Sequence, residues 1–188
     1  MKKLLPLFLL VSLAFFTSCD KDDDSPNDLI LNYDGANNFA PQLPAGDYVF
    51  AVRFPASETE QFQDSLLSEV QFYVRETPNN VRLRIFGPGI NESPGDLLYE
   101  SNALTALVES NSWYTHTLTE NLKITGEEMW IGVTFSHDAD LRSIGCDSGP
   151  AHPNGDFIFD ASEGTWQKYS DATAESVNWN IRGIVGPN

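Results

Sequence analysis

Apolar and polar residues alternate along much of the chain, and an alternation with a period of two is typical of strands that bury one face. Residues 69–75 and 81–86 follow this alternation, and a turn-forming segment, Thr77-Pro78-Asn79-Asn80, separates them. We therefore expect the two stretches to form a hairpin with a single apolar face.

Two later stretches show the same alternation. In residues 128–135 the apolar residues share one face and Trp130 falls on the other, whereas in residues 177–185 Trp179 shares the apolar face. We therefore expect Trp179 in the core and Trp130 on the solvent side of its strand.

Further short strands are predicted where aromatic and β-branched residues gather between Gly, Pro, Asn and Asp. They are expected at residues 29–33, 48–54, 97–100, 113–118, 141–146, 157–160 and 166–169. Residues 58–67 are the one helical candidate, of one or two turns. About ten short strands without a strand–helix–strand rhythm predict an all-β fold, a single antiparallel β-sandwich over residues 29–188.

The N-terminal residues have the composition of a secretory signal. Lys2 and Lys3 precede an apolar stretch at residues 4–16, which is shorter than the roughly 20 residues that a membrane-spanning helix needs. Small residues and Cys19 follow, and the chain then becomes strongly polar.

The segment Phe16-Thr17-Ser18-Cys19 resembles the lipobox of bacterial lipoproteins, with Phe16 in place of the usual Leu. This resemblance implies that residues 1–18 are a signal peptide and that Cys19 is lipidated, with palmitate among the expected acyl chains. Asp20-Lys21-Asp22-Asp23-Asp24 resembles the acidic export signal of surface lipoproteins of some Gram-negative bacteria. The resemblance implies lipid anchoring in the outer membrane, exposure to the medium, and a flexible acidic tether at residues 19–28.

Three groups of segments between residues 29 and 186 resemble the jelly-roll accessory modules of secreted and surface proteins of bacteria. They are residues 70–74 with 81–86 and 94–99, residues 113–118 with 130–133, and residues 164–166 with 180–183. The resemblance implies a jelly-roll-like β-sandwich. Such modules are similar in architecture to carbohydrate-binding domains, so extracellular glycan or glycoprotein is the leading ligand class.

The charge of the chain excludes one class of partner. With 27 Asp and Glu against 11 Lys and Arg, the net charge of −16 would repel the phosphates of nucleic acid. The same excess supplies candidate metal ligands, Asp138 and Asp140 in one loop and Asp147 and Asp156 in the next. Since Ca²⁺ takes about 6–8 oxygen ligands, a structural Ca²⁺ is one interpretation and solvated turn residues are the other. We expect no other cofactor.

Aromatic residues are the candidate ligand-binding side chains, because the C–H faces of sugars stack on aromatic rings. The candidates are Trp130, whose strand face makes it the best exposed, and Trp113, Tyr114 and Trp166. For each ring, a place in the core is the alternative.

Residues 145–150 resemble the nucleophile loop of trypsin-like serine proteases, but one glycine of that loop is absent and no histidine has the family's context. A catalytic triad needs a base within hydrogen-bond reach of the serine, so we assign no catalytic residue and expect a turn. Cys146 is expected to be a buried thiol. Non-enzymatic binding is therefore the predicted function. The alternatives are a structural or assembly component of a cell-surface protein complex and a secreted hydrolase.

Overall fold

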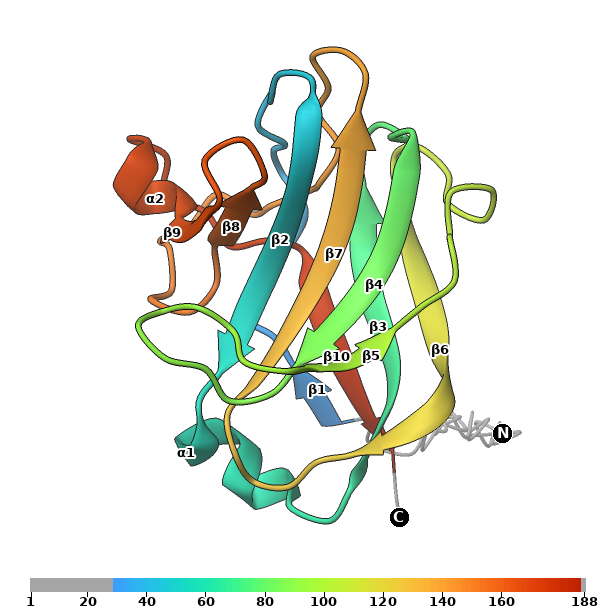
Figure 1. Cartoon of the computed structure of the whole chain (residues 1–188), viewed down its shortest axis with the longest axis vertical. Helices are drawn as coiled ribbons and strands as arrows, with labels where there is room; N and C mark the ends of the chain where they lie inside the picture. Colours follow the sequence, from blue (N-terminus) through green and yellow to red (C-terminus); the bar gives the residue numbers. More distant parts are fainter. Residues whose placement is uncertain (1–28, 187–188) are drawn as a thin grey trace, which may run out of the picture.

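The computed structural model describes residues 29–186, except the side chain of Asn121, and is a sandwich of two antiparallel sheets (Figure 1). The strands are β1 (Leu29–Leu31), β2 (Gly46–Phe54), β3 (Leu66–Val74), β4 (Asn80–Phe86), β5 (Leu97–Glu100), β6 (Ser112–Lys123), β7 (Met129–His137), β8 (Phe157–Asp160), β9 (Thr165–Lys168) and β10 (Ile181–Gly186). The helices are α1 (Ala56–Thr59), the 3₁₀ turn η1 (Glu60–Phe62) and α2 (Tyr169–Ala172). None of these short helices of residues 29–186 could span a bilayer.

The strand order is that of a jelly roll. One sheet has the order β1-β10-β3-β6 and the other β5-β4-β7-β2-β8-β9. The chain crosses repeatedly between the sheets, and its last strand returns to lie between β1 and β3, as in a double Greek key. The β8–β9 hairpin extends the second sheet beyond β2 (Figure 1). The predicted antiparallel, jelly-roll-like sandwich is confirmed.

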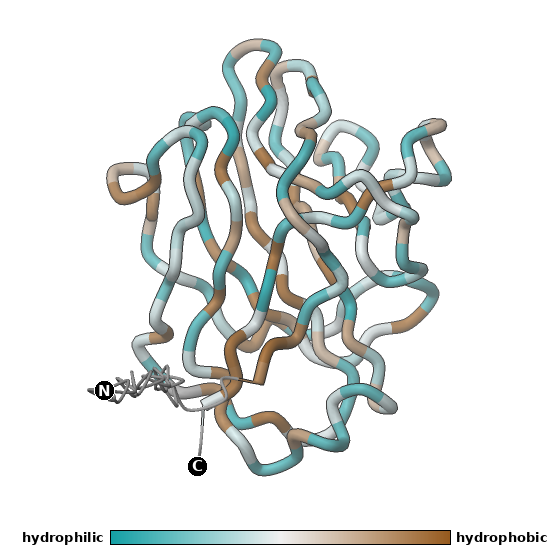
Figure 2. The backbone as a smooth tube through the Cα atoms, turned by 180° about the vertical axis from the view of Figure 1, so that it is seen from behind, coloured by the Kyte–Doolittle hydropathy of each residue, from teal (hydrophilic) through white to brown (hydrophobic). Residues whose placement is uncertain are grey.

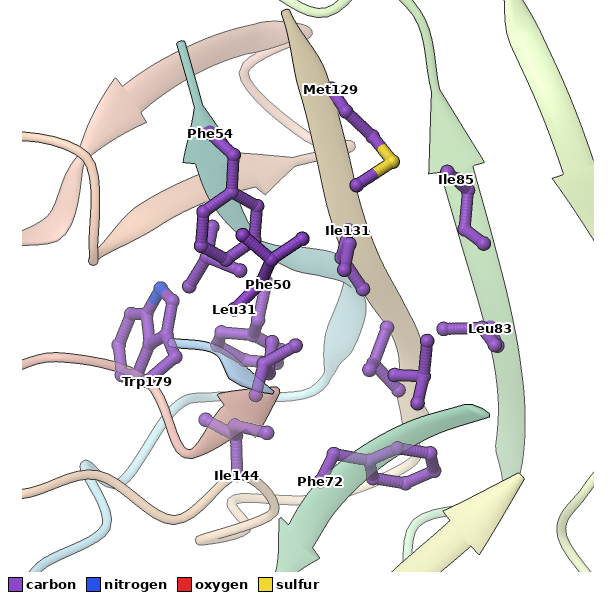
Figure 3. Close-up of a cluster of buried hydrophobic side chains, with 14 of the residues drawn as sticks. Leu31, Phe50, Phe54, Phe72, Leu83, Ile85, Met129, Ile131, Ile144 and Trp179 are labelled. Atoms are coloured by element: carbon purple, nitrogen blue, oxygen red, sulfur yellow. The ribbon is translucent and has the colours of Figure 1, made fainter. Parts of the chain in front are cut away.

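The core lies between the two sheets and consists of the inward-facing members of each alternating strand. Phe50, Phe72 and Trp179 are fully buried there, and the rings of Phe50 and Trp179 meet edge to face with centroids 5.2 Å apart (Figure 3). The predicted core position of Trp179 is confirmed. Figure 2 shows apolar residues along the strands and polar residues in most of the loops.

The predicted hairpin of residues 69–75 and 81–86 is wrong. Both strands exist, but β3 pairs with β10 and β6, whereas β4 pairs with β7 and β5 in the other sheet. Their alternating apolar residues are all buried, because the two strands face each other across the core rather than lying side by side. The turn around the buried Pro78 therefore carries the chain from one sheet to the other.

Several predicted elements are shorter than expected or absent. Residues 141–146 form no continuous strand, because Leu141, Ile144 and Cys146 bridge to three different segments in turn. The closing strand begins only at Ile181, and the helical turns α1 and η1 span residues 56–62 rather than 58–67. Cys146 is fully buried, as expected. The predicted signal peptide at residues 1–18 and the tether at residues 19–28, with Cys19, lie outside the described residues.

Candidate functional site

The outer face of the six-stranded sheet carries a groove with a cavity volume of about 270 Å³. It lies over strands β8, β2, β7 and β4, which are neighbours in the sheet. The lining residues are Asp47, Tyr48, Val49, Asn80, Arg84, Thr134, Ser136, Phe159 and Ala161. Most of them occupy the polar positions of alternating strands, so the groove is built from the side of the sheet that does not face the core.

Small residues form the centre of this sheet face. Ala51 lies opposite Gly132, and Val49 lies opposite Thr134. A Cβ atom on Gly132 would lie 3.2 Å from Val49 Cγ1, so a larger residue would push against the floor of the groove. The Thr134 hydroxyl is buried and has no hydrogen-bond partner within the described part of the chain.

The walls of the groove differ in chemistry. Phe159, which lies opposite Val49 on β8, supplies an aromatic ring on one side. Arg84 supplies a guanidinium on the other, and its Nε donates to Glu100 Oε2 at 2.6 Å. Asp47, Ser136 and Asn80 lie in one row across three strands and close the upper end with hydroxyl, amide and carboxylate groups.

Trp130 lies beside the lower end of the same sheet face, and the prediction that it is exposed is wrong. Its strand position is as predicted, on the face opposite the core, but the side chain is fully buried. The Trp130 ring packs against Phe157 and Trp166 at centroid distances of 4.6 and 5.8 Å, and the Arg53 guanidinium lies 5.7 Å from its centroid. Trp130 Nε1 donates to Glu128 Oε1 at 2.8 Å.

The loop of residues 87–96 lies next to this cluster. It crosses the lower ends of β2 and β7 in Figure 1 and is held by two contacts. Gly89 N donates to Glu128 Oε1 at 3.1 Å, and Glu92 forms an ion pair with Lys168 of β9 at 2.7 Å. Burial alone would raise the pKa of Glu128, but hydrogen bonds from Trp130, Gly89 and Arg53 outweigh it and hold the pKa below its usual value.

The remaining aromatic candidates do not form one platform. Trp166 is partly buried and covers Trp130. Trp113 is 37% exposed but lies on the outer face of the other sheet, where Arg182 sits 4.1 Å from its ring centroid. Tyr114 points the opposite way, into the sandwich, and its ring packs against Phe72 with the ring centroids 5.4 Å apart. The structure therefore brings Trp130 and Trp166 together and separates Trp113 and Tyr114 from them.

Asp147, a predicted metal ligand, holds two loops together. Its Oδ1 accepts from the backbone N–H groups of Gly149 and Asn178 at 2.9 and 2.8 Å. Its Oδ2 accepts from Gly35 N at 3.1 Å and from Asn178 Nδ2 at 2.9 Å. Burial would raise the pKa of Asp147, but these hydrogen bonds together hold it below its usual value.

The other three aspartates lie apart from it. Asp156 is fully buried, accepts a hydrogen bond from Ser170 N at 2.8 Å, and has its pKa raised by that burial. Asp138 is exposed and contacts Asn79, and Asp140 is exposed and accepts from Gln42 Nε2 at 3.3 Å. Between residues 29 and 186, no three His, Cys, Asp or Glu side chains converge as metal ligands would.

The three histidines have partners other than Ser148 in the described hydrogen bonds. His116 Nε2 bonds to Tyr99 Oη at 2.8 Å, and His137 Nε2 bonds to Ser143 Oγ at 2.8 Å. His152 Nδ1 accepts from Asn154 N at 3.3 Å. Residues 145–150 form an irregular loop with a bend at Ser148, and hydrogen bonds to Asp147 hold it in place.

Comparison with protein-family models and with curated proteins finds no match for this chain. Within the described residues, the groove of the six-stranded sheet is the feature that bears most directly on function. Sequence reasoning missed its residues, because Asp47, Ser136 and Asn80 come from three strands whose alignment is visible only once the strand pairing is known. The available signal was their shared place on the polar side of alternating strands.

Proposed function

We propose that this chain is a lipid-anchored protein of the outer membrane, exposed to the medium, whose β-sandwich binds extracellular glycan or glycoprotein without transforming it. The groove over β2, β7, β4 and β8 is the proposed binding site. The leader that ends at Cys19 and the acidic residues after it support the location, and the groove supports the binding.

The observation that carries the proposal is the pairing of an aromatic wall with a polar rim. The Phe159 ring can stack on the C–H face of a sugar, and Asp47, Asn80 and Ser136 offer carboxylate, amide and hydroxyl groups to its hydroxyls. The small residues of the floor leave room for a sugar ring between the walls. Open, preformed clefts with few convergent polar groups are the usual form of binding sites for small ligands.

Replacing Phe159 with alanine is expected to lower glycan affinity by about 2- to 13-fold, because one stacking contact on an aromatic ring contributes roughly 0.5–1.5 kcal/mol. A glycan array identifies a ligand, and isothermal titration calorimetry then compares the variant with the parent protein. Trp113→Ala is the matched control, since it removes an exposed ring from the opposite face. Absence of binding to every glycan would overturn the proposal. Equal losses of glycan affinity in the two variants would show that the groove is not the binding site.

The lipid anchor is tested on the protein purified from its native membrane. Mass spectrometry of the N-terminal peptide is expected to find a mature chain that begins at Cys19 and carries acyl chains. Cys19→Ser is expected to release the protein from the membrane fraction, because acyl chains contribute about 0.8 kcal/mol per buried CH₂ group. An unmodified thiol at Cys19 would contradict the anchor while leaving the groove untouched.

A second candidate function is a structural or assembly role in a cell-surface protein complex, and the distribution of exposed apolar residues favours it. Leu29 and Ile30 of β1 and Leu97 and Leu98 of β5 are exposed, and each pair lies on an edge strand of its sheet. Exposed apolar side chains on an edge strand, which also offers unpaired backbone groups, are typical of protein contacts. Cross-linking at Leu98 that captures one defined surface protein in intact cells, without any glycan ligand, would favour this alternative.

A further inference from the structure

Two arginines form no ion pair with an acidic side chain among the described residues. The side chains that form an ion pair with Asp or Glu are Arg53, Arg82, Arg84, Lys123, Lys168 and Arg182. Arg75 and Arg142, the remaining Lys or Arg side chains of residues 29–186, form none. In a chain with 27 acidic residues against 11 basic ones, two arginines without a carboxylate partner are unexpected.

These two arginines line the same hollow. It has a volume of about 190 Å³, lies apart from the groove of the six-stranded sheet, and is lined by Asn38, Phe39, Ala40, Arg75 and Arg142. Two guanidinium groups around one hollow bring two positive charges and several N–H donors to it. The hollow therefore favours an anion.

The backbone around the hollow is held by long-range contacts. Arg75 N donates to Ser143 O at 2.8 Å, and Arg142 N donates to Glu76 Oε2 at 2.7 Å. The Arg142 guanidinium donates through Nη1 to Ala40 O at 3.0 Å and through Nη2 to Gln42 Oε1 at 3.3 Å. These bonds orient the Arg142 side chain. Its remaining N–H donors, and those of the Arg75 guanidinium, are left for a ligand.

Two acids lie near the site, and each is bound to a group other than a guanidinium. Glu76 is occupied by the backbone amide of Arg142, and neither arginine forms an ion pair with it. Asp140 lies beyond Gln42, whose Nε2 donates to it at 3.3 Å. Both carboxylates therefore hold the loops that carry the arginines.

We propose that this hollow is a second binding site and that it takes the carboxylate of an acidic sugar residue. Guanidinium groups bind planar carboxylates with two parallel hydrogen bonds, so the pair Arg75 and Arg142 fits this group. Phe39 offers a ring to the C–H face of the sugar, and Asn38 offers an amide to a hydroxyl. The preference for a sugar over another carboxylate rests on the proposed glycan function, whereas the preference for an anion does not.

The test compares two probes of equal length, an oligomer of galacturonic acid and an uncharged oligomer of galactose, by calorimetry on the parent protein. The acidic oligomer is expected to bind more tightly, with an affinity that falls as salt is added. Arg75→Gln and Arg142→Gln are each expected to weaken its binding about tenfold or more, because each removes a charge-assisted hydrogen bond. Lys123→Gln is the matched control, since it removes one charge from an exposed ion pair at the other end of the sandwich.

Three outcomes would overturn the assignment. The first is equal affinity for the two oligomers, and the second is a loss of affinity in Lys123→Gln as large as in the arginine variants. The third is an affinity for a sulfated oligomer or an acidic peptide that equals or exceeds that for the galacturonic acid oligomer. If neutral glycans bind through Phe159 and the acidic oligomer does not bind at all, the second site fails while the proposed function stands. If the acidic oligomer binds through Arg75 and Arg142 but Phe159→Ala changes no affinity, the groove fails and the second site stands.

Discussion

Replacing Trp130 with alanine is expected to lower the free energy of unfolding by about 3–5 kcal/mol, because it opens a cavity in a fully buried aromatic cluster. The change removes the ring against Phe157 and Trp166 and the hydrogen bond to Glu128. Urea unfolding followed by far-ultraviolet circular dichroism measures the loss. Trp130→Phe keeps most of the ring volume and should cost less than half as much.

Trp113→Ala is the control for this prediction. Trp113 is 37% exposed, and its main contacts are the Arg182 guanidinium above its ring and the edge of Tyr73. An exposed cation–π contact contributes about 0.5–1 kcal/mol, so this variant should lose about 1 kcal/mol. Equal losses for the two tryptophans would contradict the burial of Trp130 and return it to the set of exposed sugar-binding candidates.

Trp130 shows what an alternating pattern can and cannot predict. The pattern places a side chain on one of two faces of a strand, and it placed Trp130 correctly on the face away from the core. It carries no information on whether a distant segment covers that face. Here Trp166 covers the ring, and the loop of residues 87–96 lies beside it, attached through Gly89 and Glu92. Because these contacts join residues far apart in the chain, local periodicity could not reveal them.

The same limit explains the wrong hairpin. A strand that alternates between apolar and polar residues buries one face in the same way whether its neighbour lies beside it or across the core. For residues 69–75 and 81–86, the pattern therefore predicts the two strands and their buried residues correctly. It predicts their pairing incorrectly. Strand number, the sandwich architecture and the core positions followed from periodicity, whereas pairing, and with it the groove, did not.

Replacing Asp147 with alanine is expected to lower the free energy of unfolding by about 3 kcal/mol at neutral pH. The change leaves the N–H groups of Gly35, Gly149 and Asn178 without their acceptor, and each buried donor that loses its partner costs about 1–3 kcal/mol. Partial access of water at this loop reduces the sum. Equilibrium unfolding in urea at pH 7 measures the effect.

The pH dependence distinguishes this role from a general loss of packing. The pKa of Asp147 in the folded protein lies below its usual value of 3.8, so folding favours the ionised carboxylate. Its contribution to stability is therefore complete above about pH 4 and is lost as the pH falls through the lower folded value. The difference between the parent protein and Asp147→Ala should shrink in strongly acidic buffer, whereas a packing defect would persist there.

Asp140→Ala separates the hydrogen-bonding role of Asp147 from calcium binding. Both aspartates were candidate Ca²⁺ ligands, but Asp140 is exposed and accepts one bond from Gln42, so its loss should change stability by no more than about 0.5 kcal/mol. If backbone N–H groups are what Asp147 binds, the cost of Asp147→Ala is the same in excess CaCl₂ and in a chelator. A cost for either variant that appears only when Ca²⁺ is present would instead assign these carboxylates to the metal, because a ligand that binds the folded state stabilises it in proportion to its occupancy.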